Sequence, residues 1–259
     1  MSARRMAAAA LAAACALGAG AVAAQNYPNK AIRIAMPFST GGTDLVTRWL
    51  AQKIAPVLGQ QVVPDPRLGA GGNIAHDAVA KAAPNGLTIG IAATATHAVN
   101  PWLYGKMPYD PLRDFAPITQ MLRVPNVLVI HPSIPAKSMK ELIALARKAP
   151  RKLSYATSGT GAAGHLGMEL LKQLENVDMV HVPYKGSANS RIDLLGGHVD
   201  VMFDVLRTAL PFKEAGKVRM LAVAALARQS IAPDVPTMDE LGYKGLEVLT
   251  WHALLAPAG

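Results

Sequence analysis

Short apolar or β-branched runs alternate with amphipathic runs from Ile32 onward, and this alternation restricts the fold more than any other feature. The runs with strand character are residues 31–36, 60–64, 87–93, 125–131, 152–157, 179–184, 198–205, 218–225 and 246–256. Apolar residues spaced three and four apart predict helices over residues 43–58, 73–83, 139–150, 163–175 and 188–197. Ser138, followed by Glu141, predicts a capped helix start. Together these signals predict an α/β fold with mainly parallel strands.

Two segments of the chain have the same order of parts. Residues 31–54 and 152–174 both read as a strand, a loop rich in Ser, Thr and Gly, and an amphipathic helix. Because a helix N-terminus leaves backbone N–H groups without partners, each loop is suited to hold an anion. The two units lie too far apart for a solenoid repeat, so we expect one in each of two lobes. The two helix N-termini would then face each other across a cleft and clamp one ligand.

The first residues have the pattern of a secretory signal. A short basic start, an Ala- and Leu-rich core and small residues predict a signal peptide over residues 1–24, cleavage between Ala24 and Gln25, and a mature protein in the periplasm. A transmembrane helix over residues 6–26 is one alternative, but its Ala and Gly content makes it weakly hydrophobic. A lipid anchor on Cys15 is another, and it would need an apolar branched residue three positions earlier, which the chain lacks.

Charge and cysteine content narrow the classes of function. The chain has 26 Lys and Arg against 17 Asp and Glu; without Arg4 and Arg5 the balance is 24 against 17, a net charge of +7. This surplus suits an anionic ligand or surface. The basic residues are scattered and aromatic residues are few, so we expect no nucleic-acid partner. Cys15, the only cysteine, lies in the signal segment, which excludes disulfides, thiol catalysis and cysteine-bound metal in the mature protein.

The sequence carries no motif for catalysis or for a cofactor. Neither loop matches GxGxxG with an acidic residue downstream or GxxxxGK[ST], and the chain has no GxSxG. Ser158 and His165 suggest a catalytic pair, but a loop serine and a histidine in a first helical turn are the simpler interpretation. No two histidines lie at i, i+4 spacing with a carboxylate nearby, so we expect no metal site. We therefore predict a protein that is not an enzyme and needs no cofactor.

Two aspartates and one lysine lie near the predicted loops. Asp44 is in the first turn of a predicted helix, where capping and pairing with the helix dipole are the favoured roles. Asp204 ends an apolar strand-like run, where α/β proteins bind ligands, and we favour a functional role for it. Next to an anionic ligand Asp204 would be repulsive unless it orients water, a loop or a ligand amine. Lys185 follows a strand-like run, and a solvated position is its simpler interpretation.

Many segments carry a family resemblance, in register from Tyr27 to Gly259. They are YPNKAIRI, MPF with the following Gly pair, LGAGGNIAHDAVAKAAPNG, THAVNPWLY, PYDPLRDFAPIT, VPNVLVIHPSIPAKSMKELIALARKAP, KLSYATSG, VDMVHVPYKGSA, DLLGGHVDVMFD, GKVRMLAVAALAR and APDVPTMDELG. These segments resemble the solute-binding proteins of tripartite tricarboxylate transporters, also called Bug proteins. The resemblance implies a two-lobed periplasmic binding protein of type II, the Venus-flytrap kind. Such a protein captures a small carboxylate and delivers it to membrane permease subunits.

The resemblance also implies domain limits and a site. Lobe 1 is expected over residues 25–124 plus 249–259 and lobe 2 over residues 125–248, in a monomer that closes on its ligand by a hinge motion. Amides and hydroxyls of two loops would hold the proximal carboxylate, partly through water. Carried over by position, the ligand-binding residues are Phe38, Ser39, Thr40, Gly41, Gly42, Thr96, His97, Ser158, Gly159, Thr160, Gly161, His165, Lys185, Gly186, Ser187, Phe203 and Asp204. Tricarboxylates, dicarboxylates, amino acids and aromatic acids are all ligands of the family.

The chain departs from the family pattern at several points. Its first loop has one residue fewer before Asp44 and has Thr40 in place of a proline, which would shift the amides at the following helix start. Ala162 and Val205 replace residues with polar side chains. Family members usually continue beyond Gly259, so we expect the C-terminal part of the first lobe to be truncated and apolar surface to be exposed. A sensory module that presents its ligand to a membrane partner, and an inactive truncated remnant, are the alternatives to solute capture.

Overall fold

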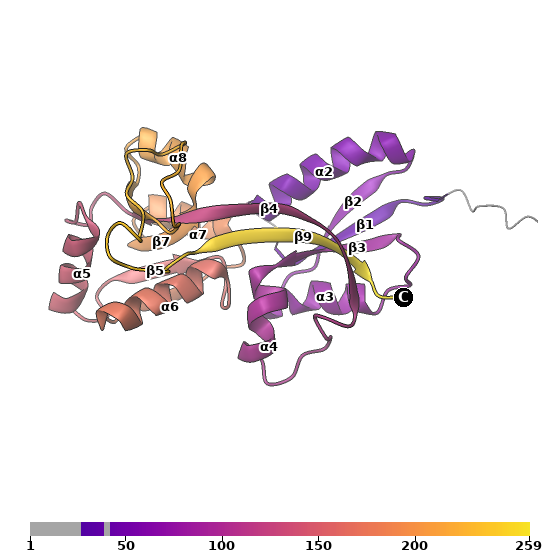
Figure 1. The fold of residues 1–259 in the computed structure, drawn as a ribbon, viewed down its shortest axis with the longest axis horizontal. Coiled ribbons are helices and arrows are strands. Elements are labelled where there is room, and N and C mark those ends of the chain that lie inside the picture. The colour runs from indigo at the N-terminus through magenta and orange to yellow at the C-terminus, as the bar shows by residue number, and fades with distance from the viewer. Residues whose placement is uncertain (1–26, 39–41) are drawn as a thin grey trace, which may run out of the picture.

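The computed structural model describes residues 27–38 and 42–259. The predicted signal peptide, residues 1–24, lies outside these residues, as do Ser39, Thr40 and Gly41 of the first loop. The fold is mixed α/β, as predicted, with helices packed along one long sheet (Figure 1). None of the helices in the described part of the chain is long and apolar enough to span a membrane.

The first half of the chain forms strands covered by helices on both faces. Its elements are β1 (Ile32–Met36), α2 (Gly42–Leu58), β2 (Val62–Pro66), the 3-10 turn η1 (Ala70–Gly72), α3 (Asn73–Ala80), β3 (Thr88–Ala93), the π-helical turn η2 (Ala95–Val99) and α4 (Asn100–Leu103). β1 pairs in parallel with β2 and with β3. Since side chains alternate along a strand, Ile34 clusters with Ala51 of α2, whereas Ala35 clusters with Ala75 of α3. This double cover explains why β1 is apolar at nearly every position.

The second half continues the alternation. Its elements are β4 (Phe115–Ile130), α5 (Met139–Lys148), β5 (Ser154–Thr157), α6 (Ala163–Glu175), β6 (Val180–Pro183), α7 (Ser187–Leu195), β7 (Val201–Val205), α8 (Leu206–Glu214), β8 (Arg219–Val223) and β9 (Leu249–Pro257). The predicted cap of α5 is confirmed, because Ser138 Oγ accepts the Glu141 N–H at 3.2 Å. Helix α8 was not predicted from the sequence, because it contains Pro211 and proline normally interrupts a helix. Burial of Leu206 and Ala209 in the core favours the helix despite this proline.

The central strands run against the predicted direction. The strand order is β2-β1-β3-β9-β4-β7-β5-β6, with β8 also paired to β4. The pairs β1–β2, β1–β3, β5–β6 and β5–β7 are parallel, as predicted. The pairs β3–β9, β4–β9, β4–β7 and β4–β8 are antiparallel. β4 carries the chain out of the first half and β9 carries it back, so the two strands lie side by side in opposite directions (Figure 1).

β4 is longer than the strand predicted over residues 125–131 and begins at Phe115. Pro117 and Pro125 read as strand limits in the sequence. Pairing with β9 overrides that signal, and the ladder is irregular between Pro117 and Thr119. The later part of β4 is buried on both faces, since Leu128 and Ile130 join one core cluster while Val127 and Val129 join another. This part of β4 therefore packs against two core clusters of the second half, one on each face of the sheet.

Candidate ligand-binding site

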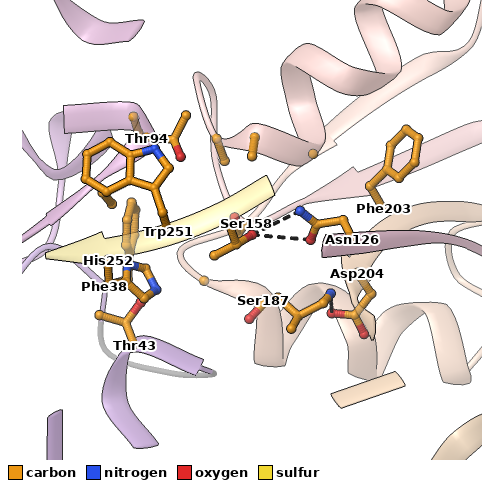
Figure 2. Close-up of a pocket in the computed structure, with 18 of the residues that line it drawn as sticks. Phe38, Thr43, Thr94, Asn126, Ser158, Ser187, Phe203, Asp204, Trp251 and His252 are labelled. Carbon is orange, nitrogen blue, oxygen red and sulfur yellow. Dashed lines mark hydrogen bonds between the residues drawn. The ribbon is translucent and has the colours of Figure 1, made fainter. Parts of the chain in front are cut away.

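A cleft lies between the two halves of the molecule, the first containing β1, β2 and β3 and the second containing β5, β6 and β7. Figure 2 shows Phe38, Thr43 and Thr94, together with Trp251 and His252 of β9, on one side and Ser158, Ser187 and Phe203 on the other. The space between the walls is about 690 Å³, a figure that includes the part open to solvent. The lining residues are Phe38, Thr43, Ala93, Thr94, Ala95, Asn126, Ser158, Ala162, Ala163, Gly164, Gly186, Ser187, Met202, Phe203, Asp204, Val205, Thr250, Trp251 and His252.

Four helices begin at this cleft. The N-terminal ends of α2, α6, α7 and α8 line it through Thr43, Gly164, Ser187 and Val205. The N-cap residues of the last three helices, Ala162, Gly186 and Val205, make no side-chain hydrogen bond to their helices. Backbone N–H groups and the positive ends of helix dipoles therefore meet in one place, an arrangement that stabilises an anion.

The charged side chains in the cleft wall are few. Among the described lining residues there is no Lys and no Arg. Asp204 is buried in this wall, and its carboxylate receives two hydrogen bonds from Arg191, with Nε to Oδ2 at 2.6 Å and Nη2 to Oδ1 at 2.7 Å. The Val205 N–H also donates to Asp204 Oδ1 at 2.8 Å. Because Arg191 neutralises Asp204, this aspartate does not have to repel an anion bound in the cleft.

The floor of the cleft is formed by polar residues of β4 and β9. Asn126 Nδ2 donates to the Val248 carbonyl and to Thr250 Oγ1, each at 3.0 Å. His252 Nε2 lies 3.0 Å from Thr43 Oγ1 in the first turn of α2. Burial lowers the pKa of His252 to about 4, so its imidazole is neutral at neutral pH. The floor thus offers hydroxyl, amide and neutral imidazole groups rather than charges.

The second loop, residues 158–161, is held by its own backbone and packs against the first half of the chain. The main-chain carbonyl of Ser158 accepts the Gly186 N–H at 3.0 Å, and this bond connects the loop to the start of α7. Gly161 has a φ of +82°, and a Cβ at this position would lie 3.1 Å from Asn100 Oδ1 and 3.4 Å from a methyl group of Leu103. Both the backbone conformation and the close contact between the halves therefore favour glycine here.

Six of the residues predicted to bind ligand line the cleft, namely Phe38, Ser158, Gly186, Ser187, Phe203 and Asp204. Gly42 begins α2 at the edge of the described chain. Gly159, Thr160 and Gly161 belong to the second loop but not to the lining, and Lys185 is exposed outside it. His165 also lies outside the lining, where its ring stacks on that of His181. The predicted Asp44 lies in the first turn of α2, paired with Arg48.

Thr96 and His97 occupy a buried polar cluster rather than the cleft wall. Thr96 is fully buried and its hydroxyl bonds the backbone of Ala93 at 3.1 Å. His97 packs edge-on against His76, with ring centroids 4.7 Å apart, and burial lowers the pKa of His97 to about 3. The two predicted residues support the end of β3, and it is their neighbours, Thr94 and Ala95, that line the cleft.

Sequence reasoning missed several residues of this site. Arg191 lies in a helix predicted from its apolar spacing, and no local signal showed that its side chain meets Asp204. Asn126, Thr250, Trp251 and His252 lie within strand-like runs, where a single polar residue reads as a surface position. Their common feature is a position on β4 or β9, and that pairing was not predicted.

Residues 46–259 match a protein family that is described as the tripartite tricarboxylate transporter family receptor. The chain belongs to this family. A curated relative, protein BugT of Bordetella pertussis, is 37% identical over 93% of this chain and 74% of its own length. The solved structure of Rpa4515 of R. palustris with adipate is 39% identical, covers 90% of this chain and 78% of its own, and has a TM-score of 0.86. The structure of the periplasmic binding protein BugD is also 39% identical with the same coverage, and its TM-score is 0.84.

Tripartite tricarboxylate transporter receptors are solute-binding proteins, and the predicted Bug-type resemblance is confirmed. The agreement with periplasmic binding proteins also confirms the predicted fold class, because two halves joined by β4 and β9 match those structures over most of this chain. The shortened first loop, predicted to displace the amides at the start of α2, includes Ser39, Thr40 and Gly41, which the structure does not describe.

Proposed function

We propose that this chain is a periplasmic solute-binding protein that captures a small carboxylate between two lobes. The observation that carries the proposal is the meeting of four helix N-termini at one cleft whose buried carboxylate is already neutralised. Backbone amides bind a carboxylate without the rotamer entropy that a Lys or Arg side chain would lose. The adipate bound by a relative of 39% identity supports a carboxylate as the ligand class.

The captured solute would be delivered to the membrane permease of a tripartite tricarboxylate transporter. We propose that the protein acts as a monomer and that lobe 1, residues 25–124 plus 249–259, moves against lobe 2, residues 125–248. The hinge would lie where β4 leaves β9, since Val124 pairs with Thr250 while Asn126 pairs with Val205 of β7. Hinge residues at strand crossings absorb the change in backbone angles during closure.

Calorimetric titration tests the proposal. The mature chain, residues 25–259, is titrated with citrate, malate, adipate, glutamate, nicotinate and benzoate, after a thermal melt has shown cooperative unfolding. We expect saturable heat with at least one acid and a rise of the melting temperature in its presence, because a ligand bound only to the native state stabilises it. A well-folded sample that gives no heat with any of the acids would contradict the proposal.

A further inference from the structure

We propose that His165 is a positioning residue, whose Nδ1 accepts the Gly161 N–H and thereby fixes the backbone of the second loop. The inference deepens the proposed function, because this loop contributes Ser158 to the cleft. The Gly161 nitrogen lies 3.2 Å from His165 Nδ1. A backbone N–H only donates, so His165 must present a bare Nδ1 lone pair, with its proton on Nε2.

The position of His165 explains why the chain uses a histidine for this bond. His165 is the third residue of α6, and the N-cap residue Ala162 has no side-chain acceptor. In a capping box the third helical residue reaches back to an N–H before the helix, usually with a Glu or Gln side chain. A carboxylate here would place a negative charge beside the proposed anion site. A neutral imidazole accepts the same hydrogen bond without that charge.

A second imidazole holds the other end of the loop. His181 Nε2 lies 2.7 Å from Thr157 Oγ1, and this hydroxyl lies 3.3 Å from both the nitrogen and the carbonyl oxygen of Gly159. The rings of His165 and His181 stack at 4.3 Å, and that of His181 stacks on Tyr155 at 4.9 Å. The column of three rings thus contacts the loop directly at Gly161, through His165, and indirectly at Gly159, through His181 and the Thr157 hydroxyl.

The surroundings keep both imidazoles neutral. Burial lowers the pKa of His165, with Lys172 adding to the effect and Glu169 opposing it. Burial and the neighbouring His165 lower the pKa of His181 to about 4. The other charged and titratable groups around the pair are tied to one another. Lys172 Nζ lies 2.9 Å from Glu169 and 3.8 Å from Asp178, and the Tyr155 hydroxyl donates to Glu169.

Two substitutions distinguish the contribution of the His165 hydrogen bond from that of its ring. His165→Asn keeps an acceptor close to the position of Nδ1 but removes the ring, whereas His165→Phe keeps a stacking ring without an acceptor. The readouts are hydrogen-exchange protection of the Gly161 amide in the ligand-free protein, measured by NMR, and calorimetric affinity for adipate, malate, nicotinate and benzoate. We expect His165→Phe to lose roughly tenfold in Gly161 protection and in affinity, the effect of one hydrogen bond. His165→Asn should retain both within about threefold.

Acidification provides a further readout, since a protonated Nδ1 cannot accept. Gly161 protection in the wild type should fall only as the pH decreases below 6.5, the ordinary histidine pKa, because burial lowers the pKa of His165, whereas protection in His165→Asn should stay level. If His165→Phe matches the wild type and His165→Asn loses protection, the ring alone matters and the inference is overturned. If the wild type binds none of the four acids, the failure belongs to the proposed function, and the Gly161 exchange of the ligand-free variants still decides the role of His165.

Discussion

Arg191 of α7 and Asp204 of β7 form a two-point ion pair in the wall of the cleft, with both hydrogen bonds at 2.7 Å or less. The Asp204 side chain is 1% exposed and that of Arg191 13%. Arg191 is held in turn by the Thr208 hydroxyl at 2.9 Å. The pair allows a carboxylate to lie at the carboxyl end of β7 without repelling a bound anion and fixes α7 against β7, while the bond to Thr208 joins α7 to α8.

Removal of Arg191 should leave a buried, uncompensated carboxylate. We expect Arg191→Met to lower the free energy of unfolding by about 3–5 kcal/mol and to weaken carboxylate binding, because Asp204 would then repel the ligand. Urea unfolding and calorimetry measure the two effects.

The double variant Arg191→Met with Asp204→Leu should be more stable than Arg191→Met alone, since no charge is then buried. The exposed pair of Arg48 with Asp44 serves as the matched control. Arg48→Met should change the free energy of unfolding by about 1 kcal/mol or less. Equal losses from the two single substitutions would show that burial of the Arg191 pair has no energetic consequence.

A side chain at Gly161 should destabilise the protein for two reasons that can be measured separately. Its φ is +82°, and a Cβ would lie 3.1 Å from Asn100 Oδ1 across the contact between the halves. Gly216 has a φ of +68° with open space around it, so Gly216→Ala reports the backbone cost alone, roughly 1–2 kcal/mol of stability. We expect Gly161→Ala to cost at least as much and, unlike Gly216→Ala, to weaken carboxylate affinity. Equal affinities in both variants would contradict a role for this contact in binding.

Local signals in the sequence predicted much of the fold. Helix α6 has the bounds that apolar spacing predicted, and the Ser138 cap of α5 depends on two residues three positions apart. The early start of β4 at Phe115 could not be predicted, because pairing with β9, far along the chain, determines it. The antiparallel centre of the sheet has the same origin. It follows from where the chain crosses between halves, and no local pattern encodes that crossing.

The residues of the candidate site also fall into those that local sequence predicted and those that depend on distant packing. Ser158 and Gly186 come after strand-like runs and Asp204 lies at the end of one, so sequence position and resemblance predicted that they lie near the cleft. Arg191 is thirteen residues from Asp204, and the partnership of the two depends on how α7 packs beside β7. Thr96 and His97 show the reverse case, because the chain turns into η2 directly after β3, which buries Thr96 and leaves His97 half-buried outside the cleft lining.

Acid should destabilise the protein through its buried histidines. Burial lowers the pKa of His76 and of His252 to about 4 in the folded state, against 6.5 for the free side chain. The unfolded chain therefore binds protons first, so stability is intact above about pH 6.5 and falls as the pH decreases toward about 4. In urea unfolding at a series of pH values, His252→Gln should reduce the slope of stability against pH by up to about 1.4 kcal/mol per unit. An unchanged slope would mean that His252 is not held neutral.

Trp251 should report ligand binding by fluorescence. It lines the cleft on β9, whereas Trp49 and Trp102 are 58% and 90% exposed on the outer surface. A carboxylate bound in the cleft displaces water near the Trp251 indole, so its emission should change on saturation with an acid that gives calorimetric heat. Trp251→Phe should abolish this change while Trp49→Phe and Trp102→Phe retain it. If the change persists in Trp251→Phe and disappears in Trp102→Phe, the acid binds outside the cleft, and the site built from the helix N-termini is wrong.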